Sequence, residues 1–173
     1  MNETIKTLIE RRSVRSYNNK KVPKEAVEQI VLAGEYAPSG MGKQQSKIVV
    51  VENEKEVSLL SKLNAKVMGT DSDPFYGAKT VIVVFSDSES HTCVEDGSLI
   101  MGNLMNAAAD LGVDSCWIHR AKEEFETQEG KELLKSLGIE GDYEGIGHLV
   151  LGYAAAPLKE AAPRKADYVY YIR

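Results

Sequence analysis

Hydrophobic residues recur at helical spacing, three and four residues apart, along much of the chain. The pattern predicts a first helix that Asn2 caps and that leads to Arg11, with Ile5, Leu8 and Ile9 on one face. A second helix is predicted to start near Pro23, because proline suits the first helical turn, and to stop at residues 37–40. Further helices are predicted over residues 55–67, 94–111 and 128–137.

Short runs rich in β-branched residues lie between these helices. The runs 48–51 and 81–85 are bounded by turn residues and are typical of strands covered on both faces, so we expect both in the middle of a sheet. Residues 115–118 and 148–153 predict two more strands. The C-terminal run 168–172 favours β-structure but is too short to be stable alone. We expect it to dock onto a sheet edge of its own chain or of a partner.

The predicted helix over 94–111 is apolar around most of its circumference. Its polar stripe is narrow and consists of Asn103, Asn106 and Asp110. One sheet covers only one side of a helix, so burial of the remaining surface requires another element. We expect a partner subunit to provide it.

Length and charge narrow the classes of function. The 173 residues form one expected domain of 19.0 kDa over residues 1–173, with 43% hydrophobic and 27% charged residues. A net charge of −5 argues against nucleic acid or an anionic membrane as the main partner. The charge is uneven, however, because residues 1–24 carry +5 and residues 159–173 carry +2. The cationic ends therefore flank an acidic body.

The sequence also gives an expected location. Its N-terminus is charged where a signal peptide needs an apolar run, and no stretch approaches the roughly 20 apolar residues of a membrane span. Cys93 and Cys116 are too few for a disulfide framework. We therefore expect a cytoplasmic protein.

The densest group of charged residues follows the first predicted helix. Arg11, Arg12 and Arg15 surround Ser13, and guanidinium groups bind phosphate oxygens in pairs. A generic arginine pair is more often solvated surface. The enclosed serine and a second basic pair, Arg164-Lys165, favour a phosphate site instead.

A second candidate site lies between the second helix and the first strand. Gly40 and Gly42 let the backbone approach a flat ligand, while Ser39 and Gln44 offer hydrogen bonds that orient it. The alternative is a plain connector. No glycine-rich dinucleotide motif follows a strand, and no phosphate-binding loop of the Gly-x4-Gly-Lys-Ser/Thr type occurs. Rossmann-type and P-loop chemistry are both unsupported.

Taken together, five segments resemble the nitroreductase family. They are residues 11–17, 37–41, 75–80, 115–121 and 145–153. The resemblance implies an α+β fold in three layers, α/β/α, with a central mixed, mainly antiparallel sheet, in an intertwined homodimer. It further implies FMN at the subunit interface, NADH or NADPH as hydride donor, and a nitroaromatic, quinone or flavin as acceptor, with ping-pong kinetics and no catalytic side chain.

The same resemblance assigns residues to the cofactor. The phosphate and ribityl chain would be held by Arg11, Arg12, Ser13, Arg15, Arg164 and Lys165. The ring would be contacted by Pro38, Ser39 and Gly40 of the partner with Gln44 nearby, by Asn64 at its pyrimidine edge, and by the backbone of Ile118, His119 and Arg120 near N5. Many relatives have Asn-x-Gln-Pro-Trp after Gly40, where this chain has residues 42–46 without Trp or Pro, so a nitroaromatic substrate is not assumed.

Other interpretations remain open. The chain could bind flavin without being a reductase, as a carrier, a dehalogenase-like protein or a flavin-destroying protein, or it could be an interaction domain without cofactor. A zinc site could use His91, Cys93, Cys116 and His119. Cys116 and His119 are three residues apart on a predicted strand and so point to opposite faces, which disfavours a shared zinc ion. Cys116 is more simply interpreted as a small core residue. We interpret His148 as a structural histidine with its hydrogen bonds satisfied.

Overall fold

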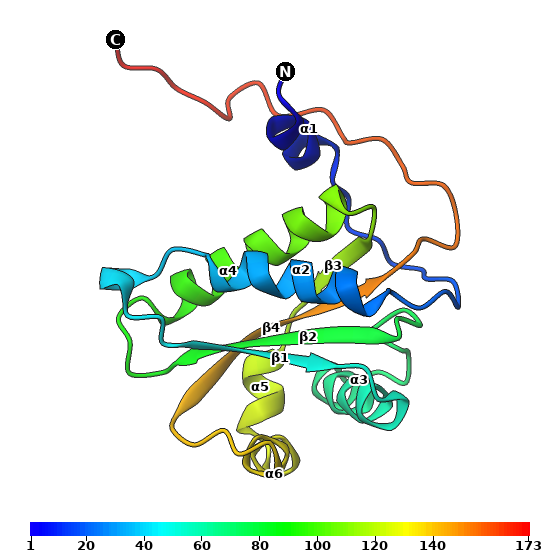
Figure 1. The fold of residues 1–173 in the computed structure, drawn as a ribbon, viewed down its shortest axis with the longest axis vertical. Helices are drawn as coiled ribbons and strands as arrows, with labels where there is room; N and C mark the ends of the chain where they lie inside the picture. The colour runs from blue at the N-terminus through cyan, green and yellow to red at the C-terminus, as the bar shows by residue number, and fades with distance from the viewer.

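The computed structural model describes residues 1–173 and contains helices, strands and one short 3₁₀ turn, η1. In chain order they are α1 (Glu3–Glu10), α2 (Lys24–Glu35), η1 (Gly40–Gly42), β1 (Ser46–Val51), α3 (Glu54–Met68), β2 (Thr80–Asp87), α4 (Cys93–Asp110), β3 (Asp114–Ile118), α5 (Ala121–Glu126), α6 (Gln128–Ser136) and β4 (Tyr143–Gly152) (Figure 1). No helix combines the length and the apolar character that crossing a lipid bilayer requires.

The four strands form one sheet in the order β1-β2-β4-β3, and all neighbours are antiparallel. The parallel component of the expected mixed sheet is an isolated bridge between Ser13 and Ser115. β2 lies in the centre as predicted, and its first seven residues are buried. The prediction for residues 48–51 was wrong, because β1 is an edge strand whose side chains are at most half-buried. A continuous apolar run does not by itself distinguish a central strand from an edge strand.

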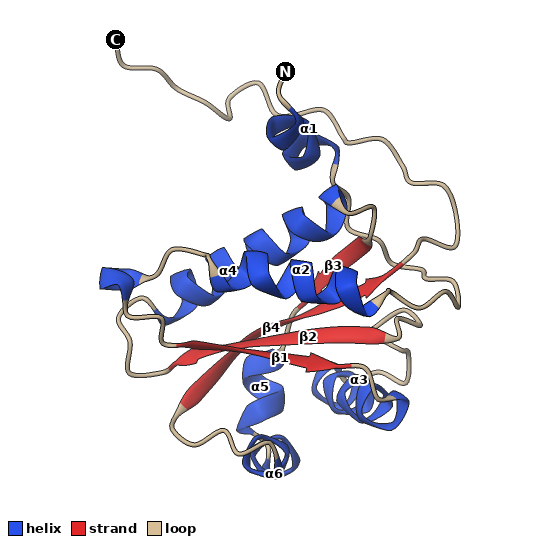
Figure 2. Cartoon of the chain, in the orientation of Figure 1, coloured by secondary structure: helices blue, strands red, loops and turns tan.

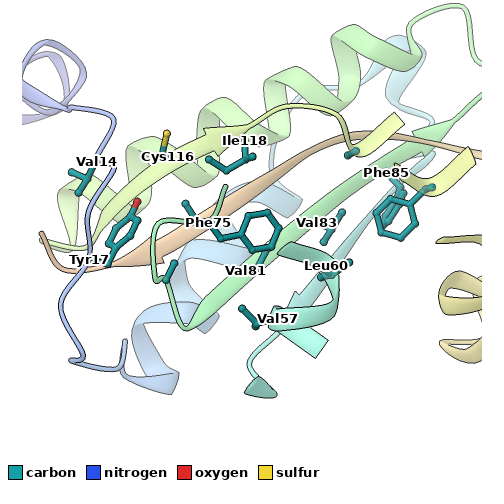
Figure 3. Close-up of a cluster of buried hydrophobic side chains, with 14 residues drawn as sticks. Val14, Tyr17, Val57, Leu60, Phe75, Val81, Val83, Phe85, Cys116 and Ile118 are labelled. Atoms are coloured by element: carbon teal, nitrogen blue, oxygen red, sulfur yellow. The ribbon is translucent and has the colours of Figure 1, made fainter. Parts of the chain in front are cut away.

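Helices cover both faces of the sheet, which gives the expected three layers (Figure 2). The core between the sheet and α2 and α4 includes Ile30, Leu104 and Leu149. The core on the opposite face, toward α3, α5 and α6, includes Leu60 and Phe85 (Figure 3). Helices with predicted apolar faces therefore lie on both sides of the sheet.

Two segments lie outside this body. The Asn2 side chain caps α1 by accepting a hydrogen bond from Ile5 N–H at 3.0 Å, as predicted. No residue of α1 is buried, and Leu8 and Ile9 on its apolar face are 47% and 52% exposed. Residues 155–173 are exposed, form no strand and run past α1 away from the sheet (Figure 1). The tail does not dock onto its own sheet, so the partner's edge is the alternative that remains.

Sequence patterns missed α5 and the first half of β4. β4 begins at Tyr143 rather than at His148, because Gly145 and Gly147 weaken the strand pattern there. These glycines permit close packing. A Cβ on Gly147 would lie 2.2 Å from Nε1 of Trp117, so the indole covers the strand at a position where a side chain does not fit.

Candidate functional site

The arginine-rich segment after α1 runs beside β3. Val14 N–H donates to Ser115 O at 3.0 Å, next to the bridge between Ser13 and Ser115. Val14 and Tyr17 point into the core beside Cys116, as Figure 3 shows, while Ser13 and Arg15 are exposed. The alternation presents polar side chains on an outer face and anchors the segment through its apolar ones.

Several polar atoms in this region are buried without a hydrogen-bond partner. They are Arg11 Nη1, Tyr17 OH and Ser115 Oγ, with Arg12 Nε beside them. Burial raises the pKa of Tyr17 well above its ordinary value, so the hydroxyl keeps its proton and can donate. Buried polar groups nearly always have partners. Arg11 and Ser115 line the same small hollow near the end of α4, so an oxyanion such as phosphate would supply the acceptor that both donors lack, whereas Tyr17 belongs to the core on the other face of the sheet.

Arg12 has a different environment from Arg11. Its Nη1 donates to the carbonyl oxygens of Ile9, Glu10 and Arg11 at 2.9, 2.8 and 2.7 Å. Those carbonyls lie at the end of α1, where backbone acceptors have no partner within the helix. Arg12 therefore caps α1, and its contact with a phosphate stays a prediction.

The second basic pair is not brought to this group. Arg164 and Lys165 are exposed in the tail and form no ion pair or side-chain hydrogen bond. Leu158, at the start of the tail, does line the hollow of about 190 Å³ that Arg11 and Arg12 also line. The tail thus passes the arginines, and a phosphate contact by the pair stays a prediction.

The loop that contains Ser39 and Gly40 is fixed to the start of α4. Gly40 N–H donates to Asp96 Oδ1 at 2.8 Å, and Thr92 donates to Asp96 Oδ2 at 3.0 Å. A Cβ on Gly40 would lie 2.3 Å from Thr92 Oγ1, so the close approach requires glycine. Gln44 N–H donates to Ser39 Oγ at 3.1 Å, which closes the loop. Pro38, Ser39 and Gln44 line one wall of a surface hollow of about 660 Å³.

The two candidate regions lie at opposite ends of α4. Asp96 in the first turn holds the Gly40 loop, while Ala109 in the last turn lines the hollow beside Arg11. At 1.5 Å per residue, these turns are about 20 Å apart along the helix. Figure 1 shows η1 and α1 at the two ends of this helix. One chain therefore does not bring Gly40 and Arg11 together.

The third region follows β3. Ile118 is buried, His119 is exposed, and Arg120 has a left-handed backbone with φ 77° and ψ 12°, an uncommon state for a residue other than glycine. Asn64 is fully buried, and its Nδ2 donates to His119 O at 2.9 Å and to Glu124 Oε2 at 3.1 Å. The amide is directed inward, so a contact between Asn64 and a flavin ring stays a prediction.

The structure also tests the expectation for His148 and the zinc alternative that uses Cys93 and Cys116. His148 is fully buried, but neither ring nitrogen has an aligned hydrogen bond, so the expectation of a satisfied histidine was wrong. Cys93 and Cys116 belong to the cores on opposite faces of the sheet. No three His, Cys, Asp or Glu side chains form a metal-binding group, so the zinc alternative is unsupported.

Comparison with known sequences identifies the family. The profile of the nitroreductase family matches residues 8–71 and 66–153, which together span the arginine segment, the Gly40 loop and the turn after β3. The chain belongs to the nitroreductase family. The resemblance carried by the five sequence segments is thereby confirmed.

Individual proteins resemble this nitroreductase-family chain in sequence, and a solved structure among them has the same fold. A Bacteroides fragilis nitroreductase solved with bound FMN is 28% identical, with a TM-score of 0.91 and coverage of 100% of both chains. An Archaeoglobus fulgidus protein provisionally named NADH dehydrogenase/NAD(P)H nitroreductase is 28% identical over 158 residues, or 88% of this chain and 86% of that protein. A Bacillus subtilis enzyme named FMN reductase (NAD(P)H) is 34% identical over 76 residues, 44% of this chain, but the match spans only 30% of that enzyme's length.

Sequence reasoning missed several residues around the site. Asp96 and Thr92 support the Gly40 loop, and Glu124 contacts Asn64. Acidic residues in the first turn of a helix are common for electrostatic reasons alone, so nothing local distinguishes Asp96 or Glu124 from Glu95 or Glu123. Burial, which separates them, depends on the tertiary structure.

Proposed function

We propose that this chain is an FMN-dependent oxidoreductase that takes hydride from NADH or NADPH and reduces a small acceptor, a nitroaromatic, quinone or flavin. One observation carries the proposal: Arg11 Nη1 and Ser115 Oγ, from two residues that line one hollow beside β3, are buried without an acceptor. A phosphate monoester satisfies such donors. An interaction domain without a cofactor has no reason to bury them.

The residues of one chain fit both ends of FMN. Arg11, Ser13 and Arg15 would hold the phosphate and ribityl chain beside Ser115. The turn formed by residues 118–120 lies further along β3, with Ile118 about 10 Å from Ser115 at 3.3–3.4 Å per residue. Its backbone would contact the ring. When bound, FMN supplies a reversible hydride acceptor, so the protein's task is to position the cofactor and its two substrates.

We infer that the site is completed by a second copy of the chain. The Gly40 loop lies about 20 Å along α4 from Arg11 in one chain. A twofold partner can place its own Gly40 loop against the ring held by the first chain. The exposed side chains of Val94 and Leu99 on α4, together with residues 155–173, supply apolar surface for that contact. The dimer would also cover the open edge at β1.

The kinetics follow from a single shared site. The nicotinamide and the acceptor would occupy the same face in turn, which gives ping-pong kinetics. No acid-base motif or activated nucleophile stands out in the sequence, and none is needed if the cofactor carries the chemistry. Residues 42–46 lack the Trp and Pro that many relatives have there, so the nitroaromatic is not singled out among the three acceptors.

The test is the visible absorbance of the purified protein after addition of FMN. We expect a bound flavin spectrum that NADH or NADPH bleaches without oxygen and that a quinone or nitroaromatic restores. Protein that binds FMN but is not bleached by either nicotinamide would contradict the reductase function and favour a flavin carrier. Protein that retains no FMN would contradict the cofactor assignment.

A further inference from the structure

A second group of unpartnered buried atoms lies beneath the turn at His119. Asn64 Oδ1, Glu124 Oε1, and both ring nitrogens of His148 have no hydrogen-bond partner, and all three side chains are 0% exposed. They come from α3, α5 and β4 respectively. Apolar side chains of similar volume would pack these elements without burying a carboxylate. The polar group therefore calls for an explanation other than packing.

The hydrogen bonds of Asn64 connect this group to the turn. A primary amide has two hydrogens, and the acceptors are His119 O at 2.9 Å and Glu124 Oε2 at 3.1 Å. Because both neighbours accept, the NH₂ group is fixed toward them. Loss of either acceptor would leave a buried N–H unpaired, which is unfavourable.

His148 holds the other side of the carboxylate. Its Nε2 lies 3.2 Å from Glu124 Oε2, close enough for an electrostatic contact although not aligned as a hydrogen bond. The centroid of its ring is 5.2 Å from that of Phe75 and 6.1 Å from that of Phe125. Packing between two aromatic rings restricts the imidazole, so Glu124 is confined from both sides.

The turn itself needs such support. Arg120 occupies the left-handed region with φ 77°, which is sterically disfavoured for a side chain with a Cβ. Asn64 holds the carbonyl of His119, and Glu124 N–H donates to Arg120 O at 3.0 Å. The side chain of Asn64 thus holds one peptide group of the turn, while the other accepts the first backbone hydrogen bond of α5. Backbone strain of this kind persists only where the surroundings determine it.

We propose that Asn64, Glu124 and His148 are positioning residues that hold the His119–Arg120 turn in the orientation from which its backbone contacts the flavin. The contact with flavin rests on the proposed function. The claim that the three residues hold the turn does not rest on the proposed function, because it concerns the protein without flavin. Asn64 then acts on the cofactor through His119 rather than by touching the ring.

The experiment compares variants that differ in acceptors and donors. Asn64→Leu removes the amide, and Glu124→Met removes the carboxylate with little change of volume. Glu124→Gln is the conservative variant, since its side-chain oxygen still accepts from Asn64. Leu60→Ala is the matched control, because Leu60 is buried one turn before Asn64 on α3 and has no polar contact with the turn.

The first measurement is hydrogen–deuterium exchange of the peptide containing residues 118–121 in FMN-free protein. We expect exchange about tenfold faster in Asn64→Leu and Glu124→Met, the change that loss of one hydrogen bond of ordinary strength gives. Glu124→Gln should remain within about twofold of the natural protein, by the same reasoning. If both disruptive variants exchange like Leu60→Ala, the group only packs α3 against α5 and the proposal is overturned.

The second measurement uses the FMN-loaded protein. We expect a shifted flavin absorbance band and a kcat about tenfold lower, with KM for the nicotinamide unchanged, in Asn64→Leu and Glu124→Met but not in Leu60→Ala. An unshifted band and unchanged kcat, despite faster exchange, would overturn the link to the flavin. If the natural protein binds no FMN, the proposed function fails, while the exchange result still decides whether Asn64 and Glu124 hold the turn. Should Glu124→Met not fold, Asn64→Leu with Glu124→Gln gives the same decision.

Discussion

Replacing Arg11 with alanine tests the phosphate site directly, because a neighbouring arginine provides a matched control. Arg11 Nη1 is buried without a partner, whereas Arg12 Nη1 donates to three carbonyl oxygens at the end of α1. The two residues have the same charge and adjacent positions but different structural roles. Removal of each should therefore affect a different property of the protein.

The magnitudes follow from those contacts. Arg11→Ala removes a charge-assisted hydrogen bond to phosphate, which is worth about 1.5–3 kcal/mol and corresponds to a roughly 10- to 150-fold rise in the Kd for FMN. Because Arg11 Nη1 is buried without a protein partner, its removal should not lower the free energy of unfolding measured without FMN. Arg12→Ala should instead lower the free energy of unfolding by about 1 kcal/mol, because α1 loses its C-terminal cap.

The assay is an FMN titration followed by flavin fluorescence, with thermal unfolding of the FMN-free variants measured in parallel at one ionic strength. Arg11→Lys adds a further control, since it keeps the charge but loses the paired geometry of the guanidinium and should give an intermediate Kd. Equal losses of FMN affinity in Arg11→Ala and Arg12→Ala would refute the distinction between the two arginines. An unchanged Kd in Arg11→Ala would refute the phosphate site.

Three further predictions concern stability and assembly. Gly145→Ala should lower Tm by about 2–12 °C, because its Cβ would lie 2.5 Å from Ala121 O, a backbone atom that cannot rotate away; an unchanged Tm by calorimetry would contradict this. Deletion of residues 158–173 should yield monomers in light scattering and abolish FMN retention; a persistent dimer would show that the tail is not needed for assembly. Burial raises the pKa of both Cys93 and Cys116 above the ordinary 9.0. The unfolded chain therefore loses these protons first, and the free energy of unfolding should fall as pH rises above 9. Cys116→Ala should reduce that slope in urea titrations, whereas an identical slope would exclude the thiol as its source.

The sequence determined much of the local structure. Spacing of apolar residues located α2, α3, α4 and α6, because a helix that packs on a sheet must present one apolar face. The same spacing located α1, although no residue of α1 is buried. β-branched runs located β1 and β2, and shorter apolar runs located β3 and the second half of β4. The clustering of Arg11, Arg12 and Arg15 around Ser13 indicated an anion site from composition alone.

Only the tertiary structure decided which of these residues work together. Arg11 and Arg12 are alike in the sequence, yet Nη1 of Arg11 has no partner whereas Nη1 of Arg12 caps α1. Asn64 meets His119 across 55 positions of the chain. Glu124 meets His148 through the packing of α5 on β4. The spacing of apolar residues arises because one face of a helix or strand is buried, so the pattern repeats every few residues along the chain. Contacts between distant side chains depend on sheet register and on the order of the strands, which no local spacing encodes.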